Sequence, residues 1–201
     1  MLRRILIAED HSLIRSSIQT IFLTEGITEM DEVQTCRDLQ KTLKLVQYTH
    51  LILDITLADG NSLGLLQNIF EEYPDLKVLV YSSQPSRIYD EFLRLRYGMR
   101  YICKTEGRPE TVQKLLAFLK NTKLNIDQQA DSGTTPFTEL TLRELQVLSY
   151  LLEGLSPADI STKLGIDPVT VRVHKKGLLG KTNTKNILEL RDLATLHHLY
   201  M

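Results

Sequence analysis

The sequence predicts a doubly wound α/β domain with a five-stranded parallel sheet, then a linker, then an all-α domain of four helices. Three observations predict this. Apolar strand-like runs alternate five times with helical patterns over residues 1–121, as in parallel sheets covered by helices on both faces. Residues 122–136 are polar and contain glycine and proline, which is typical of a linker. Residues 137–201 contain capped helices joined by short glycine turns.

The elements of the first domain follow one another closely. Strands are expected at residues 4–8, 30–36, 50–53, 77–81 and 101–103, the second being the weakest pattern. Helices are expected at residues 11–23, 38–46, 63–70, 88–97 and 111–119, where apolar residues recur at three- and four-residue spacing. Pro74 and Gly98 close two of these helices.

Polar side chains that could react or bind a ligand follow four of the five strands. The residues are Glu9 and Asp10 after the first strand, Asp54 after the third, Ser82 after the fourth and Lys104 after the fifth. The carboxyl ends of the strands in such a sheet lie at one edge, where ligands bind. Each residue alone has an ordinary explanation, such as a turn cap for Asp54 or a solvated end for Lys104. The joint arrangement favours a site.

The chemistry of this set points to phosphoryl transfer. Carboxylates crowded at one place repel one another, so the site is expected to bind a hard divalent cation, Mg²⁺. The Asp54 carboxylate can act as a nucleophile toward a phosphoryl donor, giving an acyl phosphate. Lys104 and the cation would neutralise the incoming charge, and the Ser82 hydroxyl could donate a hydrogen bond to a phosphoryl oxygen.

Residues 2–121 resemble the flavodoxin-like receiver domain of bacterial two-component response regulators, on Glu9-Asp10, Asp54, Ser82, Tyr101 and Lys104. The resemblance implies that Asp54 is the phosphoacceptor. It also implies that Glu9, Asp10, Asp54 and the backbone carbonyl of Thr56 hold Mg²⁺, and that Ser82 and Tyr101 form a switch pair. Phosphorylation by a partner histidine kinase is then expected to draw Ser82 and Lys104 inward and to let Tyr101 pack down. Three positions depart from the family pattern: Ala58 replaces a usual proline, and Ser62 and Arg100 replace usual glycines.

Two other interpretations were weighed. A phosphatase of the haloacid-dehalogenase type also uses an aspartyl nucleophile, but it needs an acid two residues later, where this chain has Thr56. A receiver that is never phosphorylated, and serves as a dimer scaffold for a DNA-binding regulator, stays open. The resemblance implies a regulator rather than an enzyme.

Composition is that of an ordinary globular protein, with a formal net charge of −1. No apolar run approaches the roughly 18 residues of a membrane-spanning helix, and the N-terminus turns acidic without a cleavage site, so neither a membrane nor export is expected. Cys36 and Cys103 have no metal-ligand spacing and are expected to be buried thiols in a reducing cytoplasm.

The C-terminal domain opens with Thr141 and Glu144, which are spaced as a capping box. Gly154 ends that helix, Ser156-Pro157 starts the second, and Gly165 ends it. Asp167-Pro168 then starts a third helix over residues 169–182. Helix, glycine turn and helix form the helix-turn-helix pattern, whose later helix enters the DNA major groove. Between residues 166 and 185, five cations face one anion, which favours a nucleic-acid footprint over a solvated helix face in this context.

Six side chains of this third helix are expected to contact double-stranded DNA. Arg172 and Lys176 can donate to guanine O6 and N7, and Val173 can contact a thymine methyl group. Thr170, Lys175 and Lys181 are better placed for phosphates, which position the domain without reading sequence.

Residues 140–194 resemble the LuxR-type DNA-binding domain of the NarL/FixJ regulators. The matching positions include Leu140-Thr141, Arg143-Glu144, Glu153-Gly154, Leu164-Gly165-Ile166, Thr170-Val171 and Val173-His174. The resemblance implies DNA contact by Arg172, Val173 and Lys176, and a homodimer through a last helix over roughly residues 184–199, formed on phosphorylation or on DNA. Departures are Gly177 and Gly180 within the recognition helix and Thr182-Asn183 in place of a usual Leu-Gly.

Overall fold

The structure is a computed structural model that describes residues 3–83, 86–105, 107–120 and 135–197. The chain divides into two compact units, Met1–Ser86 with Tyr97–Ala130, and Arg87–Arg96 with Asp131–Met201. Most of the predicted linker, namely its residues 122–134, lies outside the described residues, as does residue 121 of the predicted first domain. The domain bounds of 1–121, 122–136 and 137–201 therefore stay a prediction.

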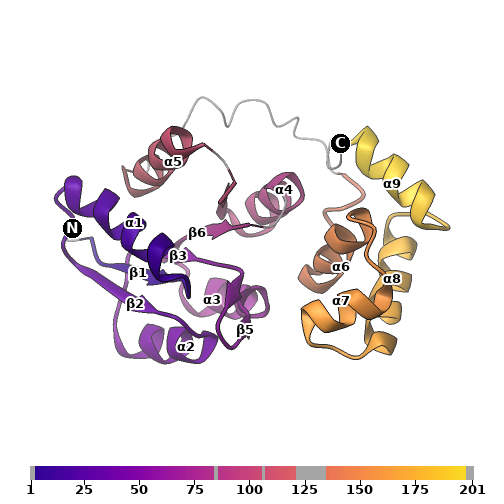
Figure 1. The fold of residues 1–201 in the computed structure, drawn as a ribbon, viewed down its shortest axis with the longest axis horizontal. Coiled ribbons are helices and arrows are strands. Elements are labelled where there is room, and N and C mark those ends of the chain that lie inside the picture. The colour runs from indigo at the N-terminus through magenta and orange to yellow at the C-terminus, as the bar shows by residue number, and fades with distance from the viewer. Residues whose placement is uncertain (1–2, 84–85, 106, 121–134, 198–201) are drawn as a thin grey trace. The chain divides into compact units, whose positions relative to one another are not determined.

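The first unit contains the predicted five-stranded parallel sheet (Figure 1). Its strands are β1 Ile5–Ala8, β2 Met30–Val33, β3 His50–Leu53, β6 Lys77–Ser82 and β7 Arg100–Cys103. Their order in the sheet is β2-β1-β3-β6-β7, and all four neighbouring pairs are parallel. The chain order reverses at β1 and β3, so the doubly wound prediction is confirmed, and the loops after these two strands lie at the switch point where such folds bind ligands.

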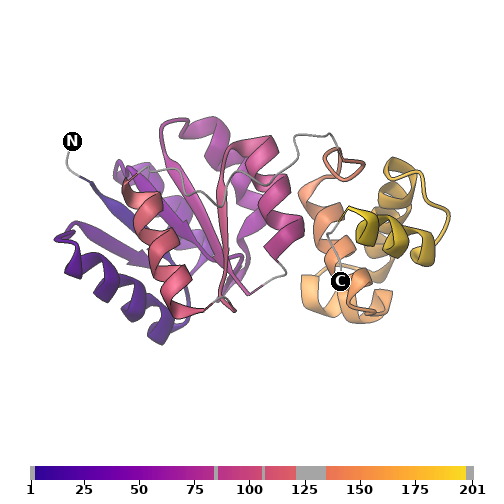
Figure 2. The same cartoon turned by 90° about the horizontal axis from the view of Figure 1, so that it is seen from above.

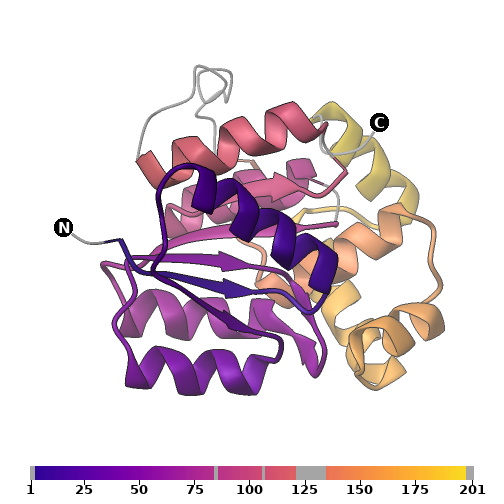
Figure 3. The ribbon, with the colours of Figure 1, turned by 60° about the vertical axis from the view of Figure 1, so that its left-hand side comes forward.

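Helices cover both faces of this sheet (Figure 3). The α-helices of the first unit are α1 Ser12–Thr24, α2 Cys36–Leu45, α3 Leu66–Glu72 and α5 Arg108–Lys120. The chain also forms α4 Ser86–Tyr97, most of which belongs to the second unit. One core cluster joins Ile5 and Ile7 of β1 with Phe22 of α1 and Leu115 of α5. Alternate residues along the strands face opposite sides of the sheet, and because helices cover both sides, β1 and β3 are buried along their whole length.

Three local features differ from the sequence prediction. Strand β2 ends at Val33, and Cys36, the last residue predicted for that strand, instead begins α2. The residues after Asp54 form a small antiparallel hairpin, β4 Thr56–Leu57 with β5 Gly60–Asn61, followed by the 3-10 helix η1 Ser62–Leu65. Helix α5 also begins at Arg108, three residues before its first predicted position, with Glu110 in its first turn. Acidic side chains near a helix N-terminus are favourable because of the helix dipole.

The four predicted C-terminal helices are present and joined by short turns (Figure 2). They are α6 Leu142–Leu152, α7 Pro157–Leu164, α8 Pro168–Lys181 and α9 Ile187–Leu196. Capping boxes at Thr141 and Ser156 start α6 and α7, and Asp167 caps α8. Gly165 ends α7 with φ of 61°, a left-handed conformation that glycine adopts without steric cost. Among the described residues, no helix has both the length and the apolar character to cross a membrane.

His50 is a buried polar residue of β3 that carries a testable consequence. Its ring lies 5.2 Å from the Phe118 ring, its Nδ1 lies 2.8 Å from the Thr49 hydroxyl, and only 3% of the residue is exposed. Burial, together with the positive charges of Lys77 and Arg3, lowers the pKa of His50 to about 4. Protonation is therefore easier in the unfolded chain, where the pKa is near 6.5.

We expect the free energy of unfolding to fall as the pH drops from about 6.5 to about 4, with His50 contributing up to about 3 kcal/mol of that loss. The variant His50→Gln keeps a polar group beside Thr49 but cannot titrate in this range. Urea unfolding of both proteins across this pH range measures the effect. The two curves should converge toward low pH, and curves that stay parallel would contradict the assignment to His50.

Candidate functional site

The sheet ladder extends one residue past the strands and so fixes the predicted site residues. The Asp54 amide donates to the Ala8 carbonyl at 2.9 Å, and the Lys104 amide donates to the Ser82 carbonyl at 2.8 Å. On the other side, the Glu9 amide donates to the Val33 carbonyl at 3.0 Å. These backbone bonds hold side chains from distant parts of the sequence at one edge of the sheet, as the sequence predicted.

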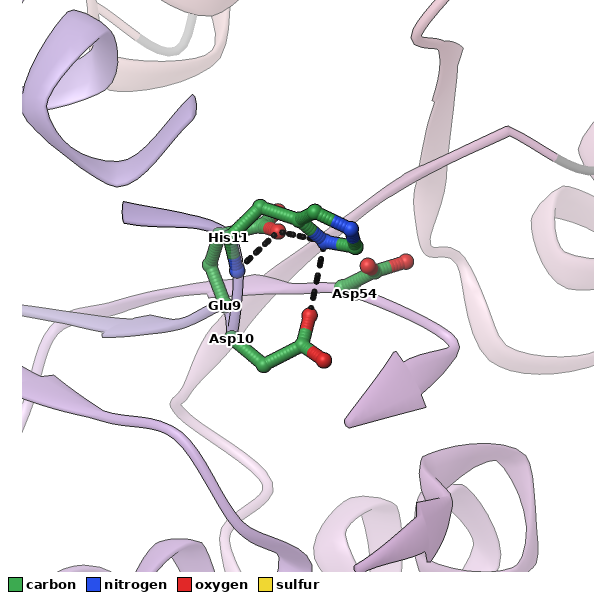
Figure 4. A group of neighbouring side chains, drawn as sticks. All are labelled: Glu9, Asp10, His11 and Asp54. Atoms are coloured by element: carbon green, nitrogen blue, oxygen red, sulfur yellow. Dashed lines mark hydrogen bonds and ion pairs between the residues drawn. The ribbon is translucent and has the colours of Figure 1, made fainter. Parts of the chain in front are cut away.

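Acidic side chains gather at this edge, and they point toward one another (Figure 4). One potential ligand atom from each of Glu9, Asp10, His11 and Asp54 lies within 4.8 Å of the others. Glu9 is 1% exposed and Asp54 is 4% exposed, so both carboxylates are shielded from water. Buried charges of like sign are costly without a compensating cation.

Lys104 supplies part of that compensation. Its ammonium lies 2.6 Å from Asp54 Oδ2 and 2.7 Å from Glu9 Oε2. Burial alone would lower the pKa of Lys104, but the hydrogen bonds to Asp54 and Glu9 outweigh burial and raise it. For Glu9, burial has the opposite effect and raises the pKa, and the hydrogen bond from Lys104 offsets this rise only in part. Lys104 is therefore a fixed positive charge between two carboxylates.

The remaining oxygens fit a divalent cation. Asp54 Oδ1 is buried, and no hydrogen-bond donor in the described part of the chain reaches it. Glu9, Asp10 and Asp54 offer only oxygen ligands, which suit Mg²⁺. Thr56, whose backbone carbonyl is the predicted fourth ligand, lies in β4, two residues beyond Asp54.

Ser82 and Tyr101, the predicted switch pair, lie on neighbouring strands. Ser82 is 2% exposed, and Tyr101 is 6% exposed with its hydroxyl donating to the Ser82 carbonyl at 3.3 Å. Tyr101 is thus already packed down in this structure, and Lys104 already contacts Asp54. The movement expected for Lys104 toward the site, and the packing expected for the Tyr101 ring, therefore start from a structure in which both side chains already lie inward.

Two residues near the acidic cluster were missed by the sequence reasoning. His11 Nδ1 lies 2.9 Å from Asp10 Oδ1 and 3.3 Å from Glu9 Oε1. The guanidinium of Arg15 donates to the backbone carbonyls of Glu9 at 2.8 Å and Asp10 at 3.3 Å, and also pairs with Glu32. A histidine directly after the acidic pair was a usable signal for His11. Nothing in the sequence pattern pointed to Arg15.

A second candidate site lies on helix α8. Five of the six predicted DNA-contacting residues are exposed, namely Thr170, Arg172, Val173, Lys176 and Lys181, and Lys175 is half-buried. Val173 is 63% exposed, which leaves its methyl groups free for contact. Val171 and Leu178 are fully buried on the inner side of the helix.

Lys181, the sixth predicted contact, is held by a partner within the protein. Its ammonium lies 2.7 Å from Glu144 Oε2, which also accepts from the Thr141 amide at 2.7 Å. Burial raises the pKa of Glu144, but the hydrogen bonds from Lys181 and Thr141 outweigh it and lower the pKa. This ion pair competes with the phosphate contact predicted for Lys181.

Glu144 also explains one of the two glycines in the recognition helix. A Cβ on Gly177 would lie 2.6 Å from Glu144 Oε1, whereas a Cβ on Gly180 would meet nothing within 4 Å. Helix α8 runs without interruption through both positions. At the end of the helix, the Thr182 hydroxyl donates a hydrogen bond to the Leu178 carbonyl at 2.9 Å. Asn183 then takes the left-handed conformation, with φ of 52°. The departures from the usual sequence are therefore accommodated.

Comparison with known proteins matches each half of the chain to a known family. Residues 5–116 match the family described as the response regulator receiver domain, and residues 138–194 match the luxR family of bacterial regulatory proteins. Among curated relatives, the oxygen regulatory protein NreC of Staphylococcus epidermidis is 30% identical, over 95% of this chain and 96% of its own. The virulence-factor transcription regulator BvgA of Bordetella pertussis is 26% identical, over 99% of this chain and all of its own.

The fold also matches solved structures. RcsB from Salmonella enterica serovar Typhimurium, solved bound to a promoter in the presence of a phosphomimetic, has a TM-score of 0.62 and 23% sequence identity. That match covers 99% of this chain and 98% of the RcsB chain. Another RcsB structure contains two dimers bound to two parallel DNAs, with a TM-score of 0.61, 22% identity and coverage of 96% and 98%.

Proposed function

This chain belongs to the NarL/FixJ family of two-component response regulators, with a receiver domain and a luxR-type DNA-binding domain, and we propose that phosphorylation of Asp54 controls its binding to DNA. Members of this family are transcription regulators rather than enzymes. The observation that carries the proposal is the buried carboxylate of Asp54, whose Oδ2 contacts Lys104 and whose Oδ1 has no donor among the described residues.

The proposed donor is a partner histidine kinase. An Asp54 carboxylate oxygen forms a bond to phosphorus while the bond from phosphorus to the donor's histidine nitrogen breaks, and that nitrogen keeps the electron pair. Glu9, Asp10, Asp54 and the Thr56 carbonyl would hold Mg²⁺, which supplies positive charge to the transferring group. Lys104 lies between Asp54 and Glu9 and can move its ammonium from Asp54 to the new phosphoryl oxygens.

The signal is proposed to leave the site through Ser82 and Tyr101. A phosphoryl group on Asp54 would attract the Ser82 hydroxyl, and the Tyr101 hydroxyl already bonds the Ser82 carbonyl. A change at Ser82 would then be transmitted to the buried tyrosine ring on β7. The charge of the phosphoryl group, rather than its size, drives this rearrangement.

The proposed output is sequence-specific binding of α8 in the DNA major groove. Arg172, Val173 and Lys176 would read base edges, while Thr170 and Lys175 would contact phosphates, and Lys181 could do so only by leaving Glu144. A homodimer through α9, where Leu188 and Leu196 are 68% and 73% exposed, would pair two such helices on one operator. The proposed setting is the cytoplasm, where a kinase and DNA are both within reach.

An alternative remains for the input. The receiver could serve as a dimer scaffold for a DNA-binding regulator that is never phosphorylated. The buried acidic set with a lysine between its members argues for phosphorylation, because burying such a cluster costs stability and a dimer scaffold has no need of it.

The test is to incubate the full-length protein with radiolabelled acetyl phosphate, with Mg²⁺ or with a chelator, and then to select binding sites from a random DNA pool. We expect Mg²⁺-dependent label that hydroxylamine releases, as for an acyl phosphate, and tighter binding of selected DNA by the labelled protein. Label without any change in DNA binding, or no label at all, would favour the scaffold alternative.

A further inference from the structure

The hairpin that follows Asp54 stands where the family usually has a proline-containing loop. Thr56 pairs with Asn61 and Leu57 with Gly60, so Ala58 and Asp59 form the two-residue tip. Proline would restrict this loop through its fixed φ angle. With Ala58 in that place, the loop needs another source of rigidity if it is to present the Thr56 carbonyl to a cation.

Asp59 connects the hairpin tip to the start of helix α2. Its Oδ1 accepts from the Cys36 amide at 2.6 Å, and its Oδ2 accepts from the Arg37 amide at 3.1 Å. The Ala58 amide adds a third bond, to the Gln34 carbonyl at 3.0 Å. Amides at a helix N-terminus lack partners within the helix, so a carboxylate that accepts from two of them is held in position by both. These amide bonds also keep the pKa of Asp59 below its ordinary value.

The other end of the loop is fixed beside the phosphoacceptor itself. The hydroxyl of Ser62 donates to the Asp54 carbonyl at 2.6 Å, and the Ser62 amide donates to the Ile55 carbonyl at 2.8 Å. Ser62 is fully buried and takes the place of a usual glycine. Thr56 therefore lies in a segment that is held at both ends, at Ser62 by the backbone of Asp54 and Ile55, and at Asp59 by α2.

We propose that Asp59 is a positioning residue for the cation site, which fixes the β4–β5 hairpin on α2 and so preorganises the Thr56 carbonyl as a ligand. This inference rests on the proposed function, in which Thr56 contributes to Mg²⁺ binding. Mg²⁺ requires nearly ideal octahedral geometry, so freedom in one ligand lowers affinity. Partners that orient metal ligands from outside are typically worth 10- to 100-fold in affinity, and we expect about tenfold here.

Thr35 provides a matched control. Its side chain also caps α2, accepting from the Asp38 amide, but it does not belong to the hairpin. The variants Asp59→Ala and Thr35→Ala each remove a cap from the N-terminus of α2. Each is expected to lower the melting temperature of the protein. Only Asp59→Ala also removes the side-chain hydrogen bonds that connect the hairpin to α2.

The experiment measures Mg²⁺ affinity by calorimetry on the full-length protein without any phosphodonor, and amide hydrogen exchange at Ala58. Asp59→Ala should weaken Mg²⁺ binding about tenfold and speed exchange at Ala58, while Thr35→Ala changes neither. Asp59→Asn keeps an acceptor but loses the charge, and should recover most of the affinity. Equal weakening in Asp59→Ala and Thr35→Ala, or in Asp59→Ala and Asp59→Asn, would overturn the proposal, as would unchanged affinity in Asp59→Ala.

Failure of this inference differs visibly from failure of the proposed function. Because Mg²⁺ affinity is measured without phosphodonor, a protein that binds Mg²⁺ as described but takes no label would contradict only the role of Asp54 as acceptor. Labelling of Asp59→Ala that recovers at high Mg²⁺ would further support a role in holding the cation. Labelling that stays low at saturating Mg²⁺, with affinity unchanged, would place Asp59 in another role.

Discussion

Replacing Asp54 with asparagine is expected to remove phosphorylation by acetyl phosphate, with a loss of at least about 100-fold in label. The amide of asparagine has no carboxylate oxygen to form the acyl phosphate. The variant should still fold, because the Lys104 ammonium keeps its second partner, Glu9 Oε2, at 2.7 Å. Measurement of label per protein in both forms, under the same Mg²⁺ concentration, tests the assignment.

The control for this prediction is Asp10→Asn, which changes a proposed cation ligand and leaves the acceptor in place. Its label should be reduced at low Mg²⁺ and return as Mg²⁺ is raised, whereas Asp54→Asn should stay unlabelled throughout. Persistent label on Asp54→Asn would show that another residue is the acceptor. Loss of label that Mg²⁺ restores in both variants would show that Asp54 serves only to hold the cation.

The residues at the strand ends could be placed from the sequence because the topology of a doubly wound sheet brings those ends together. Glu9, Asp54 and Lys104 come from parts of the chain up to 95 residues apart, yet their ion pairs follow from that rule alone. The same logic worked for α8, where the caps and the glycine turn fix the bounds of the helices. The sequence pattern was therefore enough to place a residue when its place along a strand or helix determines its place in the fold.

The sequence pattern was not enough where a side chain bonds to a group far away along the chain. Asp59 accepts from the amides of Cys36 and Arg37, and Glu144 forms an ion pair with Lys181, and neither contact leaves a periodic signal in the sequence. Such contacts exist because buried or terminal backbone groups need partners, and many side chains could meet that need. The departures at Ala58 and Gly177 looked like weaknesses in isolation. Asp59 and Glu144 are the neighbours that account for them.

Replacing Arg172 with alanine is expected to lower the affinity for a selected DNA site by about 10- to 100-fold, corresponding to about 1–3 kcal/mol. Arg172 is exposed on α8, so its loss should leave the stability of the fold nearly unchanged. If it reads a guanine, the variant should also discriminate less at that base pair. Fluorescence anisotropy with the selected site and with single-base variants measures both effects.

Lys175→Ala is the comparison that separates base reading from charge. Lys175 is half-buried on the same helix and is proposed to contact a phosphate, so its loss should weaken all sequences alike and lower the salt dependence by about one ion. Arg172→Ala should instead reduce the difference between the selected site and its variants. A uniform loss in both proteins would assign Arg172 to the phosphate backbone, and sequence reading would then fall to Val173 and Lys176 on the exposed side of α8.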